Sequence, residues 1–354
     1  MKFFKTLLKI IGIIVGVVIV VAIALLVYLS ITEYKPKDVE DIKIEGEASG
    51  SKAELGKTFN VVSWNIGYGK FGADSDFGMD GGGNVPAATE EEVLDNLEGI
   101  EKILKQQDAD IWMIQELDRG SSRSYKIDES QYTTLNQGAF ALNYKCDFVP
   151  FPWPPFGYVR SGIYTTSTYD LESAKRYSLP CTFSWPMSAA NLKRCMQATY
   201  IPINNSDKYL VVVNMHLEAY DDGPGREAQL KQVCDFLEKE FDAGNYVIAG
   251  GDFNQNMPGC TKVYPNTHPE NWEVKEVPEN VLPDGFKCIF DSSVPSCRLL
   301  NQPYNPLDTA GTQHYVLDGF IVSSNVKVET VENIDLGFEY SDHNPVKISV
   351  TLLK

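Results

Sequence analysis

An apolar segment near the N-terminus constrains this chain most. Residues 10–29 run for 20 positions without a charged side chain, and 15 of these positions are Ile, Val or Leu. At a rise of about 1.5 Å per residue, a helix of this length spans the hydrocarbon core of a bilayer, which is about 30 Å thick. A cleaved signal peptide has a shorter apolar stretch and a small-residue cleavage site, and a buried core helix is rarely so uniformly apolar. The segment therefore predicts a transmembrane helix.

The charges that flank this segment predict its orientation. Residues 1–9 contain three lysines and no acidic residue. The flank of a membrane helix that is rich in Lys and Arg usually stays in the cytoplasm. We therefore expect a single-pass protein of the cell membrane, with residues 1–9 cytoplasmic, residues 10–29 in the bilayer and residues 30–354 extracytoplasmic.

The chain is strongly acidic. It has 31 Lys and Arg residues against 48 Asp and Glu, a formal net charge of −17, and its first nine residues are basic, so the remainder is more acidic still. A surface of this charge repels polyanions and argues against nonspecific wrapping of nucleic acid, although one local cleft can still hold a small anionic group. Residues 30–56 are rich in Glu, Lys, Ser and Gly and predict a juxtamembrane linker. Residues 57–354 predict the folded domain.

Within the domain, short apolar runs typical of strands alternate with two amphipathic helices. Residues 89–107 predict the first helix, with Thr89 as its N-cap and Glu92 completing a capping box. Residues 226–241 predict the second helix. The expected strands are 59–64, 111–115, 162–166, 196–203, 209–217, 246–249, 316–322 and 346–352. Many short strands with few helices favour two stacked sheets covered by helices over a single parallel sheet.

Polar side chains stand where these strands end. A carboxylate, an amide or an imidazole lies at or near the end of most apolar runs, at Asn65, Glu116, Asn214, His216, Asp252, Asn254, Asp318, Asp342 and His343. Each of them taken alone has a plain explanation, such as a turn residue, a surface acid or a hydrogen-bonded core histidine. Together they predict a polar rim where the strands of the two sheets meet.

The motifs at these positions resemble those of the endonuclease/exonuclease/phosphatase superfamily. They are SWNIG at 63–67, QELD at 115–118, NMHL at 214–217, GGDFN at 250–254, LDGFIVS at 317–323 and SDHNP at 341–345, in the order of the family. The resemblance implies an α/β fold, a four-layered α/β sandwich of two packed mixed β-sheets flanked by helices. It also implies metal-dependent hydrolysis of phosphate esters, with residues 57–354 as the catalytic domain.

The resemblance implies a metal site built from oxygen ligands. Glu116 is expected to be the principal ligand, with Asn65 beside it and Asp342 completing the shell. Oxygen ligands without a cysteine cluster suit Mg²⁺ or Mn²⁺. We therefore expect one of these two ions as the cofactor.

The same resemblance assigns the catalytic groups. Asp252 and Asn254 are expected to orient the attacking water and hold a phosphate oxygen, with a second metal as an alternative role for the pair. His343 is expected to act as the general base or as an electrostatic partner of the phosphate. Asp318 would fix the tautomer of His343, and His216 would contact the phosphate or act as an acid. Water attacks the phosphorus directly, so the reaction needs no seryl or cysteinyl nucleophile.

Two further residues are expected to bind the substrate phosphate. Asn214 lies two positions before His216 and so shares its face of the strand. Arg194 stands just before a predicted strand, and there the family resemblance implies an arginine that binds the scissile phosphate. Lys193 and Arg160 are alternatives for the same role.

The sequence leaves the substrate open. A phosphodiester is favoured over a monoester, and within that class both an extracellular nuclease and a phospholipid head-group phosphodiesterase fit a tethered acidic enzyme. The alternative from another class is a noncatalytic surface-binding protein that reuses the fold. No protein partner is inferred.

Other segments allow more than one interpretation. The stretches 67–88 and 257–312 are long for loops and are candidates for functional loops. The aromatic run 148–158 could insert at a membrane interface, line a cleft or pack on the body. Among the seven cysteines, Cys181 with Cys195 and Cys288 with Cys297 are local pairing options that spacing cannot decide.

Overall fold

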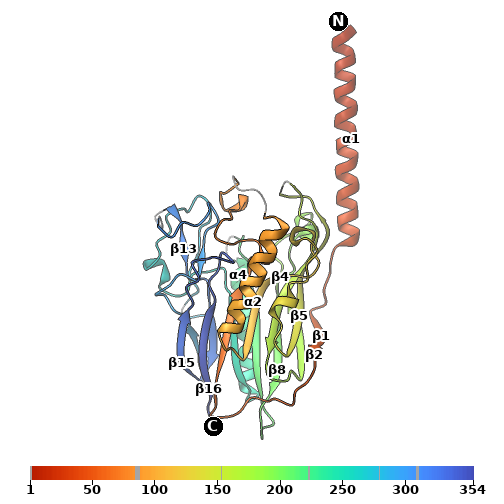
Figure 1. Ribbon diagram of the computed structural model, residues 1–354. Helices are drawn as coiled ribbons and strands as arrows, with labels where there is room; N and C mark the ends of the chain where they lie inside the picture. Colours follow the sequence, from red (N-terminus) through yellow and green to blue (C-terminus); the bar gives the residue numbers. More distant parts are fainter. Residues whose placement is uncertain (1, 84–87, 153, 222–223, 279, 308–310) are drawn as a thin grey trace.

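Two mixed sheets, each of seven strands, pack face to face in the computed structural model, and a helix covers the outer face of each (Figure 1). The four-layered α/β sandwich predicted from the sequence is therefore confirmed. The structure describes residues 2–83, 88–152, 154–221, 224–278, 280–307 and 311–354.

Each sheet orders its strands differently from the sequence. The first sheet has the order β1-β7-β8-β9-β10-β14-β11, at Val39–Ile42, Ser173–Ser178, Cys195–Pro202, Tyr209–His216, Tyr246–Asp252, Asp318–Ser323 and Phe286–Ile289. The second sheet has the order β15-β16-β3-β4-β6-β5-β2, at Val326–Asn333, Val346–Leu352, Thr58–Asn65, Ile111–Asp118, Gly157–Ser167, Gln137–Val149 and Ile44–Gly46. A small separate sheet pairs β12 with β13, at Cys297–Arg298 and His314–Tyr315. The helices are α1, α2, α3 and α4, at Lys2–Thr32, Glu90–Gln106, Ser130–Thr133 and Pro224–Asp242.

The central strands are buried on both faces, which explains their continuous apolar runs. In β3, Phe59 and Val61 pack in the core between the two sheets. The alternate residues Val62 and Trp64 pack on the outer side, in the cluster that includes residues of α2. On the other sheet, α4 contributes Leu230 and other apolar residues to the outer core.

The capping box predicted for the first long helix is present. The side chain of Thr89 accepts a hydrogen bond from the backbone N–H of Glu92, and the Glu92 carboxylate accepts one from the backbone N–H of Thr89. These bonds satisfy two donors that the first turn of a helix otherwise leaves unpaired. The helix therefore begins where the sequence places it, at Glu90.

Several strands have no counterpart among the predictions. The long strand β5 alternates buried and half-buried residues over part of its length, and β15 lies at a sheet edge with several exposed positions. A strand of this kind carries polar side chains on its open face and so lacks the apolar run on which the predictions relied.

The segment 30–56 is not the free linker that its composition predicted. β1 pairs with β7 and β2 pairs with β5, so the segment adds an edge strand to each sheet. Ala53 is fully buried, and its backbone N–H donates to the carbonyl of Pro202 over 3.0 Å. Edge strands keep one side open to solvent, which explains the polar composition.

Helix α1 is longer than the predicted segment 10–29. Within the described residues it is the one helix whose length and apolar composition allow it to cross a membrane. Its side chains are exposed along most of its length, but Leu25 and Leu29 pack against the folded body.

The seven cysteines, all of which lie in the described part of the chain, are unpaired. The local pairs considered from the sequence are therefore not formed. Cys195 is buried between the sheets whereas Cys181 is exposed, and Cys297 is buried while Cys288 packs in a different cluster.

Gly251 is required where β10 passes closest to β9. Its φ is +141°, and a Cβ atom there would overlap the backbone carbonyl of Met215. We expect Gly251→Ala to lower the free energy of unfolding by about 2–5 kcal/mol, because strain and overpacking add. Thermal or urea unfolding of the full chain in detergent measures this. The control is Gly78→Ala, where a Cβ meets open space, and equal unfolding midpoints for the two variants would contradict the account.

Candidate active site

Three neighbouring strands of the first sheet bring three of the predicted residues to one level. In the parallel pairing of β9 and β10, His216 stands opposite Asp252. In the antiparallel pairing of β10 and β14, Asp318 stands opposite the same Asp252. All three side chains are buried. The register alone therefore assembles an imidazole and two carboxylates side by side.

The second sheet supplies Asn65 and Glu116 from the ends of β3 and β4. The pairing of β4 with β6 is irregular between Ile114 and Leu117, and Glu116 lies in this bulge with a φ of +54°. A left-handed conformation at a residue other than glycine costs about 1–3 kcal/mol and is typical of functional sites. The bulge turns the Glu116 side chain toward the rim, where it comes within 3.8 Å of His216 Nε2.

Asp342 and His343 reach the same place from the turn before β16. The Nε1–H of Trp64 donates to the backbone carbonyl of His343 over 2.8 Å, and the hydroxyl of Ser341 donates to the backbone carbonyl of Asn65 over 2.8 Å. These bonds fasten the turn to β3 and fix the position of both side chains.

The predicted residues converge on Asp252. Its Oδ2 atom lies 3.0 Å from Asn65 Nδ2, 3.4 Å from His216 Nε2 and 3.7 Å from His343 Nε2. On the other side of the imidazole, His343 Nδ1 lies 2.8 Å from Asp318 Oδ2. This is the arrangement in which a carboxylate orients a histidine that works through its second nitrogen.

The two histidines have opposite electrostatic surroundings. Burial and the positive charge of Arg194 hold the pKa of His216 well below its ordinary value. Burial acts the same way on His343, but Asp318, Cys297 and Asp252 outweigh it and raise the pKa of His343 well above its ordinary value. His216 is thus a neutral imidazole and His343 an imidazolium at neutral pH.

The carboxylates of Glu116 and Asp342 form the part of the site that suits a cation. Burial, with the nearby Asp342 carboxylate, raises the pKa of Glu116 to about 7, and burial also raises the pKa of Asp342. Carboxylates that disfavour each other's charge in this way are stabilised by a bound cation. The Asn65 side-chain oxygen, which accepts from Gly67 N over 3.0 Å, could serve as an amide ligand beside them.

Mg²⁺ and Mn²⁺ fit this donor set. Mg²⁺ commonly binds through one or two carboxylates and keeps several water ligands. No group of three or more His, Cys, Asp or Glu residues in the described ranges is arranged to hold a metal by itself. The residues therefore fit an ion whose shell is completed by water and substrate rather than an all-protein cage.

Arg194 lies just before β8, as predicted, and its guanidinium is buried beside the site. Its Nε and Nη1 groups have no hydrogen-bond partner in the part of the chain that the structure describes, and Glu218 Oε2 stays 3.6 Å from Nε. The competing residues are engaged elsewhere: Lys193 binds Glu33 over 2.7 Å, and Arg160 stacks on Phe140. These buried donors leave Arg194, unlike the two competitors, with N–H groups free to bind an anion at the rim.

The predicted phosphate contact through Asn214 needs correction. Asn214 is fully buried, its Nδ2 donates to the carbonyls of Ile114 and Tyr164, and its Oδ1 accepts from Gln115 Nε2 over 2.8 Å. Its side chain thus joins the two sheets beneath the site and has no free group to offer a phosphate. Asn214 lies on the same strand face as His216, so it is near the site, but its side chain lies deeper between the sheets.

Asn254 keeps its place at the rim. Its φ is +49°, and its side-chain Nδ2 donates to the carbonyl of Leu217 over 2.9 Å. Its backbone N–H donates to Asp252 Oδ1 over 2.8 Å, so the two residues are held as one unit.

Sequence reasoning missed a group of residues beside Glu116. Arg123 binds the Asp118 carboxylate through Nε and Nη2, at 2.9 and 3.0 Å, and its guanidinium lies 3.4 Å from the ring centroid of Tyr68. The Glu116 charge contributes to raising the pKa of Tyr68, which burial raises most. Asp118 ends the QELD motif, so the motif pointed to it. Arg123 and Tyr68 lie in short 3-10 helices, where nothing in the sequence marked them.

The two long loops meet at the rim. Arg298, from the second loop, donates to the carbonyls of Gly72 and Ser75 in the first, and its backbone N–H donates to the carbonyl of Asp342. Phe77 of the first loop donates to the carbonyl of Leu300. The loops therefore form one wall beside Asp342.

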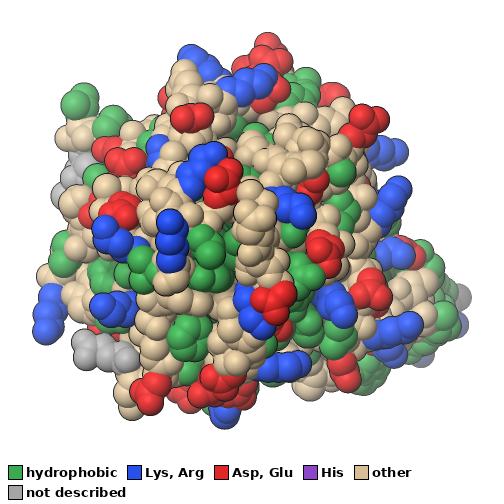
Figure 2. All heavy atoms as spheres, turned by 90° about the horizontal axis from the view of Figure 1, so that it is seen from below, with side chains coloured by type: hydrophobic (Ala, Val, Ile, Leu, Met, Phe, Trp, Pro, Cys, Tyr) green, Lys and Arg blue, Asp and Glu red, His purple; other side chains and the backbone are tan. Residues whose placement is uncertain are grey.

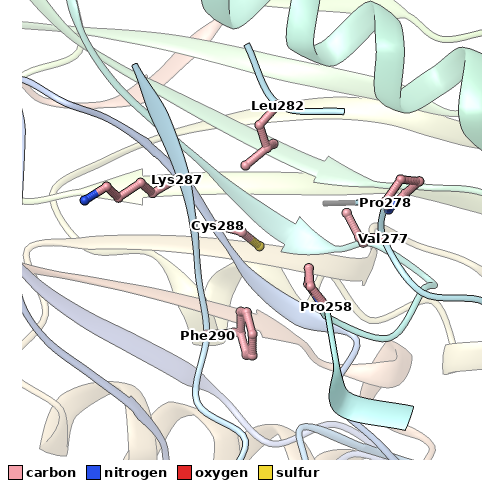
Figure 3. A pocket seen from close by; sticks show the side chains of 7 residues that line it. All are labelled: Pro258, Val277, Pro278, Leu282, Lys287, Cys288 and Phe290. Atoms are coloured by element: carbon pink, nitrogen blue, oxygen red, sulfur yellow. The ribbon is translucent and has the colours of Figure 1, made fainter. Parts of the chain in front are cut away.

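A shallow cavity on the outer side of the 257–312 stretch is distinct from this site. Its volume is about 310 Å³. Figure 3 shows the side chains that line it, which are Pro258, Val277, Pro278, Leu282, Lys287, Cys288 and Phe290. The lining holds one lysine and neither a carboxylate nor a histidine, so it offers no group for phosphate ester hydrolysis.

This chain belongs to the Endonuclease/Exonuclease/phosphatase family, whose model matches residues 62–343. The matched range contains the polar residues that converge at the rim, from Asn65 to His343. The family resemblance drawn from the motifs is thereby confirmed. No curated protein matches the sequence.

Solved structures of low sequence identity share the fold. An endonuclease/exonuclease/phosphatase from Beutenbergia cavernae has a TM-score of 0.54 at 15% identity, covering 84% of this chain and 72% of its own. One from Bacteroides vulgatus has a TM-score of 0.53 at 14% identity, covering 84% and 99%. TDP2 from D. rerio, complexed with a single-strand DNA product, has a TM-score of 0.50 at 16% identity, covering 83% and 99%. At these identities the likeness shows the fold alone.

The Asp318–His343 contact can be tested by a substitution that conserves shape. We expect Asp318→Asn to lower kcat on a phosphodiester by about 10²–10⁴-fold, because the amide no longer fixes the working tautomer or stabilises the imidazolium. KM should change much less. The control is Asp207→Asn, whose carboxylate is largely exposed, and a loss no larger than that of the control would contradict the orienting role.

Proposed function

We propose that this chain is a divalent-metal-dependent phosphodiesterase, anchored by α1 in the membrane with its catalytic domain outside the cell. The convergence of Asp252, His343 and Glu116 within one buried rim carries the proposal. Members of the family generally hydrolyse phosphate esters, and the chain keeps the full set of polar residues that the motifs predicted. A fold that had lost catalysis would not need this set.

The residues divide the work of a direct attack by water. Asp252 accepts a hydrogen bond from the attacking water and takes its proton, while Asn254 holds that carboxylate in place through its backbone N–H. His343, kept in one orientation by Asp318, presents Nε2 to the phosphate. Glu116 and Asp342 with Asn65 would hold Mg²⁺ or Mn²⁺, which would supply positive charge to offset the negative charge that develops on the phosphate oxygens.

Two groups are placed to hold the phosphate, one charged and one neutral. Arg194 offers two buried N–H donors that otherwise lack partners in the described ranges. His216 is neutral and lies between Asp252 and Glu116. A neutral imidazole can donate one hydrogen bond to a phosphate oxygen without repelling the nearby cation.

The proposal predicts activity that depends on a divalent metal. We expect EDTA to abolish hydrolysis of bis(p-nitrophenyl) phosphate by the full chain, and Mg²⁺ or Mn²⁺ to restore it. Asp252→Ala and His343→Ala should each lower turnover by at least about 10²-fold, since each removes a proton-transfer or charge-stabilising group. Unchanged turnover in both variants would favour the noncatalytic surface-binding alternative.

Metal binding has a readout that needs no turnover. We expect Mn²⁺ at about 100 times its Kd to stabilise the folded chain by about 2.7 kcal/mol. The resulting rise in melting temperature should be lost in Glu116→Gln, which has the same shape but no charge. The control is Glu329→Gln, which alters an exposed salt bridge to Lys327. A rise in melting temperature with Mn²⁺ that persists in Glu116→Gln would contradict the ligand assignment.

Two substrate classes remain under this proposal. D. rerio TDP2, which shares the fold, is complexed with a single-strand DNA product, and this supports a nucleic-acid phosphodiester. The membrane helix supports a phospholipid head group. A panel of single-stranded DNA, RNA and phospholipid vesicles, each assayed with Mg²⁺, separates the two classes.

A further inference from the structure

Four large apolar side chains are exposed on two segments beside the end of α1: Phe148 near the end of β5 and Phe151 in the loop after it, and Trp185 just before the short 3-10 helix that Met187 begins. Phe148, Phe151, Trp185 and Met187 are exposed by 38, 66, 61 and 62%. Soluble surfaces seldom gather side chains of this size and exposure, and such patches usually mark a protein or membrane contact. We call these four residues the apolar collar.

Two hydrogen bonds place the collar at the end of the apolar segment of α1. The hydroxyl of Tyr28 donates to Asp147 Oδ2 over 3.1 Å, next to Phe148. The Nε1–H of Trp185 donates to Ser30 Oγ over 3.0 Å. Tyr28 and Ser30 flank Leu29, the last residue of the apolar segment 10–29, so the collar lies at the height of the helix where a bilayer core would give way to head groups.

Packing holds the collar and the helix together as one body. Leu25 and Leu29 of α1 belong to the same apolar cluster as Tyr144, Val149 and Phe156, which lie beside the first collar segment. The second collar segment leads into Ala189 and Ala190, members of the same cluster. Just beyond the helix, Lys193 Nζ binds Glu33 over 2.7 Å. The domain is therefore docked on the helix rather than hung from a flexible tether.

The active-site rim lies at the end of the body from which α1 rises. Strand β16 begins at Val346, three residues after His343, and runs away from the rim toward the C-terminus. In Figure 1 the C-terminus lies at the opposite end of the body from the helix. That opposite end, shown in Figure 2, carries Lys, Arg, Asp and Glu side chains interspersed over its surface.

We propose that the apolar collar inserts into the head-group region of the outer leaflet and holds the active-site rim toward the bilayer. The inference rests on the proposed membrane span of α1. The partner is the lipid interface itself, because Trp is enriched where hydrocarbon meets head groups and exposed apolar side chains there gain burial. The collar fixes the tilt of the domain, which the helix alone leaves free, and favours substrates presented at the membrane surface.

Tryptophan quenching by brominated lipids tests the collar without using catalysis. The full chain is reconstituted in phosphatidylcholine vesicles with plain or brominated acyl chains, and Trp fluorescence is compared. We expect Trp185→Phe to lose a large part of the quenching seen in the unaltered chain. Adding Phe151→Trp to that variant should restore it.

The matched control places a tryptophan at the far end of the body. Leu353→Trp replaces an exposed side chain near the C-terminus, and we expect its added fluorescence to be unaffected by brominated lipids. Equal quenching in the unaltered chain and in Trp185→Phe, together with no added quenching when Phe151→Trp is introduced, would overturn the collar.

Alkaline extraction of the same vesicles separates this result from the anchoring on which it depends. A chain that stays in the vesicle pellet while its collar is unquenched refutes the collar alone. A chain released by alkali refutes the membrane span, and with it the collar, but leaves metal-dependent hydrolysis to its own tests.

Discussion

The pairing register of β9, β10 and β14 is the constraint on which the site depends. Because side chains alternate along a strand, a slip of one residue would turn Asp252 to the other face of its sheet. In the observed register, Asp252 stands between His216 on one neighbour and Asp318 on the other. Gly251 permits the close approach of β10 to β9 that this register needs. The juxtaposition of His216, Asp252 and Asp318 is therefore set by strand pairing rather than by loops.

The second sheet completes the site through a local defect. With regular pairing, the Glu116 side chain would follow the alternation of the strand. The bulge in β4 and the positive φ at Glu116 turn the side chain toward the rim instead. The strain is offset by the surrounding core, in which Trp64 and Ile114 are fully buried. Hydrophobic packing thus holds the Glu116 carboxylate where burial and the neighbouring Asp342 carboxylate raise its pKa. A site of this kind gains stability when a cation binds.

Apolar periodicity and strand-end motifs predicted much of the fold and of the rim. The central strands are buried on both faces, so their continuous apolar runs can be recognised in the sequence. The capping box of Thr89 predicted where α2 begins. The edge strands were not predicted, because one of their faces stays polar. For the same reason the composition of segment 30–56 predicted a linker. The prediction that Asn214 contacts the phosphate was wrong for a different reason. Its position on the same strand face as His216 does not show how deeply its side chain is buried between the sheets.

Long-range contacts lay beyond what a single sequence reveals. Arg123 and Tyr68 come from short 3-10 helices too short for a periodic pattern, and their stacking depends on where β3 and β4 end. The docking of α1 through Trp185 and Ser30 joins positions far apart in the chain. Local propensity predicts elements, whereas such pairings follow only from the assembled sandwich.

Anomalous diffraction from crystals of the full chain soaked in Mn²⁺ tests the central claim most directly. We predict one strong manganese peak between the carboxylates of Glu116 and Asp342, with Asp252 and His343 facing the same space. A peak elsewhere, or electron density that separates Glu116, Asp252 and His343, would contradict the account.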